Sequence, residues 1–239
     1  MKVWHLNHSG VAVETENHLL FFDIFGEALT PAENEGLEKG VINPAQMQDK
    51  DILFFVSHEH HDHFDPKIFG LDKMGKRVRY VLPEEFDEIF EDGIFVHANM
   101  QVQLEDCRIT TLDSTDIGVA YLVEIDGMRI YHAGDLNWWH WEGEPASWNR
   151  NMETGFRREI DSIAGERFDA AFVPLDPRLE AAYGLGMDYF LQKTSATHVF
   201  PMHMWEEYGY ISKYKETQTG RQHAAQIVDI SRRGEEFML

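Results

Sequence analysis

The most informative stretch of this sequence reads Ser57-His58-Glu59-His60-His61-Asp62-His63-Phe64-Asp65-Pro66. It follows Asp51 to Val56, a short apolar run of the kind that forms a buried strand. Imidazole nitrogens and carboxylate oxygens are the donors that hold hydrolytic metal ions. In an extended or tightly turned segment, His58 and His60 point to the same side. A turn would send Asp62 and His63 towards a second point, which suits two neighbouring metal ions. The alternative is a solvated, histidine-rich loop on an acidic protein.

The spacing His58-x-His60-x-Asp62-His63 after an apolar strand resembles the signature of the metallo-β-lactamase-fold superfamily of metallohydrolases. This resemblance implies an α/β fold, an αββα sandwich in which two mixed sheets are flanked by helices. It also implies a one- or two-metal site along one edge of the sheets. The length of 239 residues fits a single domain spanning residues 1–239. Among branches, the chain looks most like the ascorbate-6-phosphate lactonase-like hydrolases.

Two further candidate ligands follow strand-like segments later in the chain. Asp135 comes directly after Gly134 at the end of a hairpin strand, and the resemblance implies that it bridges both metal ions. A capping or turn aspartate is the alternative. His203 follows an apolar strand near the C-terminus, where the superfamily has its last metal ligand; the alternative is a buried core histidine. We expect His132 to be a core residue or a neighbour of the ligands.

The sequence departs from the superfamily pattern just before that hairpin. One further histidine is normal there, but Thr111 to Asp116 contains none, and His97 lies too far upstream. Asp113 falls nearest to the expected position, with Asp116 as the other candidate. Either a carboxylate replaces the imidazole, or the first site is weakened or empty. Because a carboxylate is the harder donor, it would shift the preference from zinc towards manganese or iron.

Six other side chains are candidates for contact with a substrate: His8, Trp138, Trp139, Trp141, Asp176 and Arg178. Three tryptophans within four residues of a loop cannot easily all face inward, so we expect them to line a pocket mouth rather than the core. Arg178 is a candidate anion contact, with a surface salt bridge as the alternative. His8 lies in the first tight turn, either near the metals or as a surface histidine.

These residues together predict a metal-dependent hydrolase that acts on a small lactone, ester or phosphoester. The expected cofactor is one or two divalent metal ions, zinc first, with manganese or iron as alternatives. His58, His60 and Asp113 would hold the first ion; the second would be held by Asp62, His63 and His203. The two residues expected to act in catalysis are Asp135, as the bridge, and Asp62, which would also orient the attacking water. The alternatives are a sensing protein with a degraded first site and a nuclease of the same fold.

Charge and composition narrow the expected partners to small molecules. The sequence has 21 basic and 42 acidic side chains, a net charge of −21. Such a field repels polyanions, so we expect no nucleic-acid partner. No apolar run approaches the length of a membrane span, and the N-terminal residues do not resemble a secretory signal. The single Cys107 fits a reducing compartment, so we expect a cytoplasmic protein, and a homo-oligomer is left open.

The rest of the chain predicts further elements. Three short strands open it, and a long loop over the active-site edge follows. A short helix and a closing polar helix are expected later. The three strands are Val3–Leu6, Val11–Glu14 and Leu19–Asp23, and the loop spans residues 26–50. The short helix is expected over Pro83–Phe90 and the polar helix over Gln222–Arg232.

Overall fold

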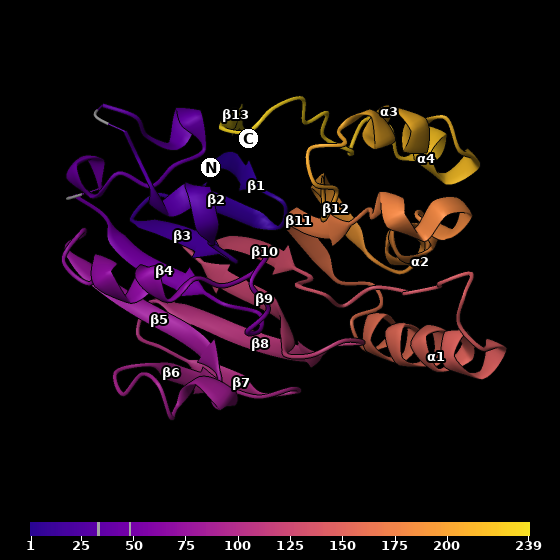
Figure 1. Cartoon of the computed structure of the whole chain (residues 1–239), viewed down its shortest axis with the longest axis horizontal. Coiled ribbons are helices and arrows are strands. Elements are labelled where there is room, and N and C mark those ends of the chain that lie inside the picture. Colours follow the sequence, from indigo (N-terminus) through magenta and orange to yellow (C-terminus); the bar gives the residue numbers. More distant parts are fainter. Residues whose placement is uncertain (33, 48) are drawn as a thin grey trace.

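Two mixed β-sheets packed against each other form the centre of this computed structural model, which describes residues 1–32, 34–47 and 49–239 (Figure 1). The first sheet has the order β13-β1-β2-β3-β4-β5-β6. Its strands are β1 (Lys2–Asn7), β2 (Gly10–Glu14), β3 (His18–Phe22), β4 (Asp51–Phe55), β5 (Arg77–Pro83), β6 (Ile94–Val96) and β13 (Glu235–Met238). The three opening strands match the sequence prediction.

The second sheet has the order β12-β11-β10-β9-β8-β7. Its strands are β7 (Gln101–Gln103), β8 (Cys107–Asp113), β9 (Val119–Ile125), β10 (Met128–His132), β11 (Arg167–Pro174) and β12 (Ser195–Met202). The helices α1 (Ala146–Ser162), α2 (Leu185–Lys193), α3 (Gly209–Lys215) and α4 (Gln218–Gln222) lie on the side of this sheet. Within the described residues, no helix is long and apolar enough to cross a bilayer.

Strand β4 shows why the first sheet is buried on both faces. Leu53 and Phe55 point into the core shared by the two sheets, whereas Ile52 and Phe54 point to a second apolar layer. That outer layer is completed by short 3₁₀ helices: η1 (Gly26–Leu29), η2 (Leu37–Lys39), η3 (Pro44–Gln46), η4 (Pro66–Leu71) and η5 (Glu84–Phe86). Because β4 is covered on both sides, its sequence is a continuous apolar run rather than an alternating one.

Parallel strands send their carboxyl ends towards the same edge of each sheet. Strands β3, β4 and β5 are parallel neighbours in the first sheet, as are β10, β11 and β12 in the second. The histidine-rich stretch follows β4, and Asp135, Asp176 and His203 follow β10, β11 and β12. The sheets therefore deliver these polar residues to one common edge.

The two sheets approach closely where the chain leaves β4. The Val119 amide donates to the Ser57 carbonyl at 3.0 Å, and the Tyr121 hydroxyl donates to the Val56 carbonyl at 2.7 Å. A Cβ atom on Gly118 would lie 1.9 Å from the Ser57 carbonyl oxygen, and one on Gly134 would lie 2.6 Å from the Ser57 Cβ. Both glycines also have positive φ, so these two positions require glycine for two independent reasons.

Two predicted helices differ from the structure. The polar helix predicted over Gln222–Arg232 is wrong: α4 ends at Gln222, and a turn then leads to an isolated bridge between Ile227 and Val199 of β12. The Val199 N–H donates to the Gln226 carbonyl, the Val228 N–H donates to the Val199 carbonyl, and Ile227 is buried, so tertiary packing overrides helix propensity. The helix predicted over Pro83–Phe90 is reduced to the single turn η5 because β5 extends through Pro83.

An ionic cluster joins the two sheets at the edge opposite the carboxyl ends of the parallel strands. The His18 imidazole lies 3.0 Å from Asp106 Oδ2 and 2.9 Å from Asp126 Oδ2, and it thereby joins β3 to two loops of the second sheet. Arg79 donates two hydrogen bonds of 2.8 Å to the Asp106 carboxylate, and Arg77 donates another. Hydrogen bonds from Arg79 hold the pKa of Asp106 well below its usual range despite partial burial. The arginines supply the positive charge here, so this cluster is structural.

We expect Asp106→Asn to lower the free energy of unfolding by about 1–2 kcal/mol at pH 7, because the arginines and His18 lose a charged acceptor. A carboxyl group with a depressed native pKa stabilises the fold above its unfolded pKa of about 3.9, and this contribution disappears as the pH falls below that value. The difference from wild type should therefore shrink between pH 7 and pH 3.5 in urea unfolding. Asp229→Asn, which removes an exposed partner of Lys215, is the matched control and should cost less than about 0.5 kcal/mol. A loss independent of pH would contradict this account.

Candidate metal centre

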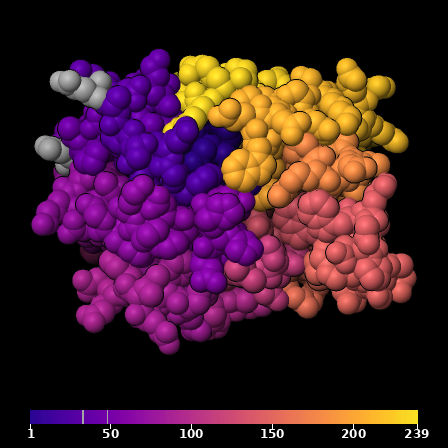
Figure 2. Space-filling model, in the orientation of Figure 1, coloured from indigo at the N-terminus to yellow at the C-terminus, as the bar shows by residue number. Residues whose placement is uncertain are grey.

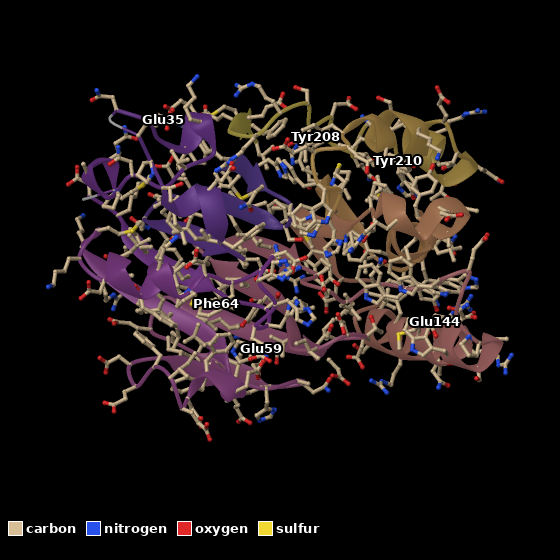
Figure 3. All side chains as sticks on the ribbon, in the orientation of Figure 1. Glu35, Glu59, Phe64, Glu144, Tyr208 and Tyr210 are labelled. Atoms are coloured by element: carbon tan, nitrogen blue, oxygen red, sulfur yellow. The ribbon has the colours of Figure 1, made fainter. Side chains whose placement is uncertain are left out.

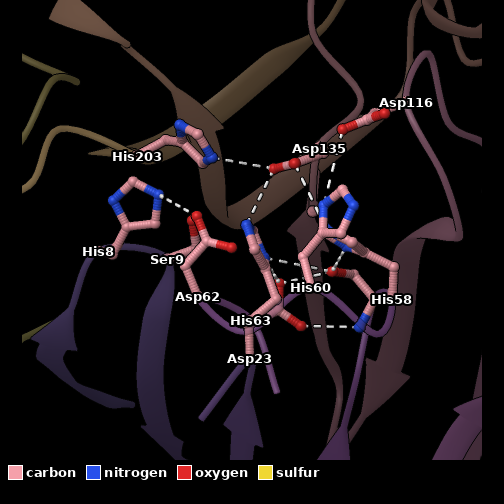
Figure 4. Close-up of polar contacts among 12 residues, drawn as sticks. His8, Ser9, Asp23, His58, His60, Asp62, His63, Asp116, Asp135 and His203 are labelled. Atoms are coloured by element: carbon pink, nitrogen blue, oxygen red, sulfur yellow. Dashed lines mark hydrogen bonds and ion pairs between the residues drawn. The ribbon is translucent and has the colours of Figure 1, made fainter. Parts of the chain in front are cut away.

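The loops after β4, β10 and β12 place the predicted ligands side by side at the common edge of the two sheets (Figure 4). Glu59 and Glu144 mark two of the loops that flank this region, the one after β4 and the one before α1 (Figure 3). Figure 2 shows where the two halves of the chain meet on this face. The N-terminal half is indigo to magenta, and the C-terminal half beside it is orange to yellow. Residues far apart in the sequence therefore share one site.

One group of donors consists of His58, His60 and Asp135, whose ligand atoms all lie within 4.8 Å of one another. His58 Nε2 is 3.0 Å from His60 Nδ1 and 3.4 Å from Asp135 Oδ2. His58 is fully buried, whereas the His60 side chain is 44% exposed and faces the solvent side of the group. These three donors can hold one divalent ion.

A second group consists of His8, Asp62, His63 and His203, again with ligand atoms within 4.8 Å of one another. His8 Nε2 lies 3.7 Å from Asp62 Oδ2. Asp135 Oδ1 lies 3.1 Å from both His63 Nε2 and His203 Nε2, while its other oxygen faces His58. The carboxylate of Asp135 thus stands between the two groups, in the position of a bridge.

The atoms that point into the second group have no hydrogen-bond partner in the described part of the chain. Both nitrogens of His8, Nε2 of His63, Nε2 of His203 and Oδ1 of Asp135 are buried and make no well-directed hydrogen bond, although Asp135 Oδ1 lies at ion-pair distance, 3.1 Å, from the two Nε2 atoms. Leaving such groups unpaired in a protein interior costs free energy, so a buried set of them needs an explanation such as an ion. Nitrogen and oxygen donors in this number and spacing fit a divalent metal ion.

Three of the buried histidines of the centre, His58, His63 and His203, are oriented through Nδ1. Ser57 Oγ lies 2.8 Å from Nδ1 of His58, and an Asp23 oxygen lies 2.7 Å from Nδ1 of His63. An Asp176 oxygen lies 2.9 Å from Nδ1 of His203. Such partners fix the ring and leave Nε2 free to bind a metal ion, and their loss typically weakens metal binding about 10–100-fold.

Asp176 was predicted as a substrate contact, and the structure corrects this. Its side chain is fully buried and holds both His203 and the Arg178 guanidinium, so it cannot reach a ligand in the cavity. Asp23 and Ser57 were missed by the sequence analysis. Asp23 directly follows the buried strand β3, but its partnership with His63 spans forty positions, which no local pattern reveals.

Charges in the centre are strongly coupled. Burial alone would lower the pKa of His63, but the carboxylates of Asp135 and Asp23 raise it to about 10. Burial would raise the pKa of Asp135, yet His63 and His203 hold it well below its usual range. His8 differs, since burial and its histidine neighbours lower its pKa. A metal ion must therefore displace a proton from His63, and the affinity of the centre should fall as the pH falls.

Asp113 and Asp116, the two candidates for the third ligand of the first ion, lie in different places. The Asp113 carboxylate accepts a hydrogen bond of 3.0 Å from Arg158 of α1 and is not part of either donor group. The Asp116 carboxylate faces His60 at 3.8 Å (Figure 4). Asp116, which is also outside both groups, is thus the nearer of the two to the first group, whereas Asp113, the residue predicted as the ligand, pairs with Arg158 instead.

A cavity of about 590 Å³ opens directly above the donors. It is lined by His60, His61, Asp62, Thr115, Asp116, Asp135, Trp139, Trp141, Trp148, Met152, Arg178 and His203. Trp139, Trp141 and Arg178 therefore lie where the sequence predicted. Trp148 and Met152 were missed, because they belong to α1 and only the packing of that helix brings them to the cavity.

Trp138 and His8 lie outside the lining of this cavity. Trp138 packs between Phe156 and Tyr189 and is covered by the Arg157 guanidinium at 4.7 Å, so its assignment to the pocket is corrected. His8 is stacked between Trp205 and His203 and belongs to the second donor group rather than to the cavity wall.

Comparisons with solved structures identify the architecture. Igni18, a metallo hydrolase from the archaeon Ignicoccus hospitalis, is 15% identical, with a TM-score of 0.65, and the match covers 100% of this chain and 98% of that one. YhfI from Bacillus subtilis, a metallo-β-lactamase fold protein, is 13% identical with a TM-score of 0.59, and 99% of each chain is covered. CmlA from Streptomyces venezuelae, a diiron β-hydroxylase, is 14% identical with a TM-score of 0.52, covering 86% of this chain and 45% of that one. No protein-family model and no curated protein matches the sequence.

The two aspartates give a direct test of the first donor group. Asp116→Asn should lower the metal content of the purified chain, or weaken binding of the more loosely held ion about tenfold or more, because an anionic donor beside His60 is lost. Asp113→Asn should leave metal binding unchanged, since only its ion pair with Arg158 is removed. Elemental analysis and calorimetric titration of the metal-free protein measure both. If only the Asp113 variant loses metal, Asp113 rather than Asp116 is the ligand.

Proposed function

We propose that this chain, which has the metallo-β-lactamase fold, is a metal-dependent hydrolase. The observation that supports the proposal is the floor of the cavity, where buried and unpaired nitrogen and oxygen atoms converge from separate loops. A fold alone does not establish a reaction, since the same architecture serves different chemistry. The donor set opening into a cavity with room for a small substrate is what favours hydrolysis here.

In this proposal each donor group holds one divalent ion. The first ion is held by His58 and His60, with Asp116 beside them. The second is held by Asp62, His63 and His203, and His8 is an additional nitrogen donor on its buried side. Asp135 is shared by both. When bound, such ions lower the pKa of a water molecule towards neutrality and stabilise negative charge on the oxygen of a substrate carbonyl or phosphoryl group.

The residues of the chain hold and orient the reacting groups. The Asp62 side chain is 15% exposed and lines the cavity, so it can accept a hydrogen bond from the attacking water and receive its proton. The Asp135 backbone is fixed because the Trp139 indole N–H donates to its carbonyl oxygen at 2.9 Å. Asp23 and Asp176 prevent rotation of His63 and His203, so the geometry of the centre is set before substrate arrives.

Zinc is the metal that the second group fits best, because it is rich in imidazole nitrogen. The first group, with carboxylates of Asp116 and Asp135 beside two histidines, is also suited to manganese or iron. The diiron hydroxylase CmlA supports iron as a metal that this architecture can accommodate. We therefore propose zinc in the second group, and zinc, manganese or iron in the first.

The proposed substrates are small lactones, esters or phosphoesters, as the resemblance to the ascorbate-6-phosphate lactonase-like branch suggests. A small-molecule substrate agrees with a cavity of about 590 Å³. The buried free thiol of Cys107 agrees with a cytoplasmic location, where thiols stay reduced. A sensing protein without turnover is the second candidate, because the first donor group is partly exposed and has fewer donors than the second.

Metal-loaded protein should hydrolyse at least one member of a panel of 4-nitrophenyl esters, phosphodiesters and chromogenic lactones. Chelation should abolish the activity, and re-addition of zinc or manganese should restore it. Asp62→Asn and Asp135→Asn should each lower kcat about 100-fold or more, because proton transfer and ion bridging are lost. Asp113→Asn is the matched control, with an aspartate that pairs with Arg158 outside the donor groups. Stoichiometric metal binding without turnover of any member would favour the sensing alternative.

We expect no binding of duplex DNA or structured RNA at physiological salt. With a net charge of −21, the chain gains little from the release of counterions that drives such binding. Fluorescence anisotropy of labelled duplexes at 50 and 200 mM salt measures this. A steep, salt-dependent affinity would support a nuclease of this fold instead.

A further inference from the structure

The aromatic side of the cavity is a flat surface made by the partly buried Trp141 ring, which is backed by the buried Trp139. The rings of Trp139 and Trp141 are stacked nearly parallel, with centroids 6.2 Å apart and an angle of 8° between their planes. The backbone of Trp141 is fixed to α1, because its N–H donates to Asn149 and its carbonyl accepts from the Asn149 amide. Trp148 and Met152 of the same helix complete this wall. A flat apolar group can therefore bind here with little ordering of the protein.

A single guanidinium adjoins this surface. Arg178 is the only arginine or lysine among the residues that line the cavity within the described ranges. Its carbon Cζ lies 5.8 Å from the centroid of the Trp141 ring. Asp176 accepts hydrogen bonds from Nε and Nη2 and so locks the side chain, which is nonetheless 49% exposed. The hydrogen bonds of Arg178 with the described residues leave Nη1 for a ligand.

Arg178 lies between the flat surface and the donor groups. Its Nη2 is 3.5 Å from Nδ1 of His203, a residue of the second group. Asp62, Asp116 and Asp135 surround the rest of the cavity floor. An anionic group of a substrate is thus attracted only near Arg178 and the metal ions of the proposed centre. A flat group of the same substrate would then extend from there onto the Trp141 ring.

We propose, on the basis of the hydrolase function above, that the substrate is an anionic ester that carries a flat apolar group next to its charged centre. A phosphodiester in which the alcohol that stays on phosphorus is aromatic is the simplest compound of this class, because its negative charge is on the phosphoryl group that reacts. In its hydrolysis, water forms a new bond to phosphorus and the bond to the leaving alcohol oxygen breaks. A phosphate monoester and the alcohol are released, because the proton that Asp62 takes from the attacking water passes on to the leaving oxygen.

The test compares two diesters with the same leaving group, phenyl 4-nitrophenyl phosphate and methyl 4-nitrophenyl phosphate. Wild type should prefer the phenyl compound about tenfold in kcat/KM, through the aromatic surface. Trp141→Ala should abolish this preference and Trp141→Phe should retain most of it. Arg178→Met should lower kcat/KM about 10–100-fold for both diesters but change the neutral 4-nitrophenyl acetate little, since only the diesters carry a charge.

Arg157→Met is the matched control, because Arg157 also covers a tryptophan ring, that of Trp138, but lies outside the cavity. It should behave as wild type. Equal kcat/KM for the two diesters in wild type, or an equal loss on the neutral ester in Arg178→Met, would overturn the inference while the hydrolase function stands.

Binding of diphenyl phosphate, measured by calorimetry and tryptophan fluorescence, separates the inference from the proposed function. We expect Kd to rise about tenfold in Trp141→Ala and in Arg178→Met, in both metal-loaded and chelated protein. If Kd rises in both variants but the wild type hydrolyses no compound, the ligand class would be supported and the proposed hydrolase function overturned. A Kd for diphenyl phosphate that is unchanged in both variants would overturn the substrate class.

Discussion

The buried carboxylate of Asp23 is the contact on which the geometry of the centre depends. It accepts hydrogen bonds of 2.7 Å from the backbone N–H and from the hydroxyl of Ser57, and it also lies 2.7 Å from Nδ1 of His63. Burial opposes its ionisation, yet the neighbouring histidines keep its pKa below the usual value. One side chain thus fixes the end of β3, the exit from β4 and the ring of a metal-binding histidine.

Ser57 carries this constraint to the second sheet. Its backbone and Cβ occupy the space beside Gly118 and Gly134, where no larger residue fits, and its carbonyl accepts the Val119 amide. Asp135 directly follows one of these glycines. Close packing of the two sheets therefore also fixes the position of Asp135, so a donor set assembled from distant segments is positioned by the fold itself.

The parts of the centre that can be predicted from the sequence are the local ones. His58 to His63 form one turn after a strand, and Asp135 and His203 each follow a strand, so pattern and position suffice to bring them together. Spacing favours Asp113 over Asp116 because it does not say which side of β8 faces the cavity; the ion pair of Asp113 with Arg158 decides that. The role of Asp176 and the position of Trp138 likewise depend on contacts with His203 and α1, which lie far away in sequence.

The two donor groups differ in a way that bears on how the centre works. In the second group the side chains of His8, His63 and His203 are at most 2% exposed, and Asp62 and His203 line the cavity. In the first group His60 is 44% exposed, and Asp116 beside it is 45% exposed. Desolvated and pre-oriented donors bind an ion more tightly than mobile, hydrated ones, because less order must be imposed on binding. In the proposed two-ion centre, the second group would therefore hold its ion more tightly than the first group.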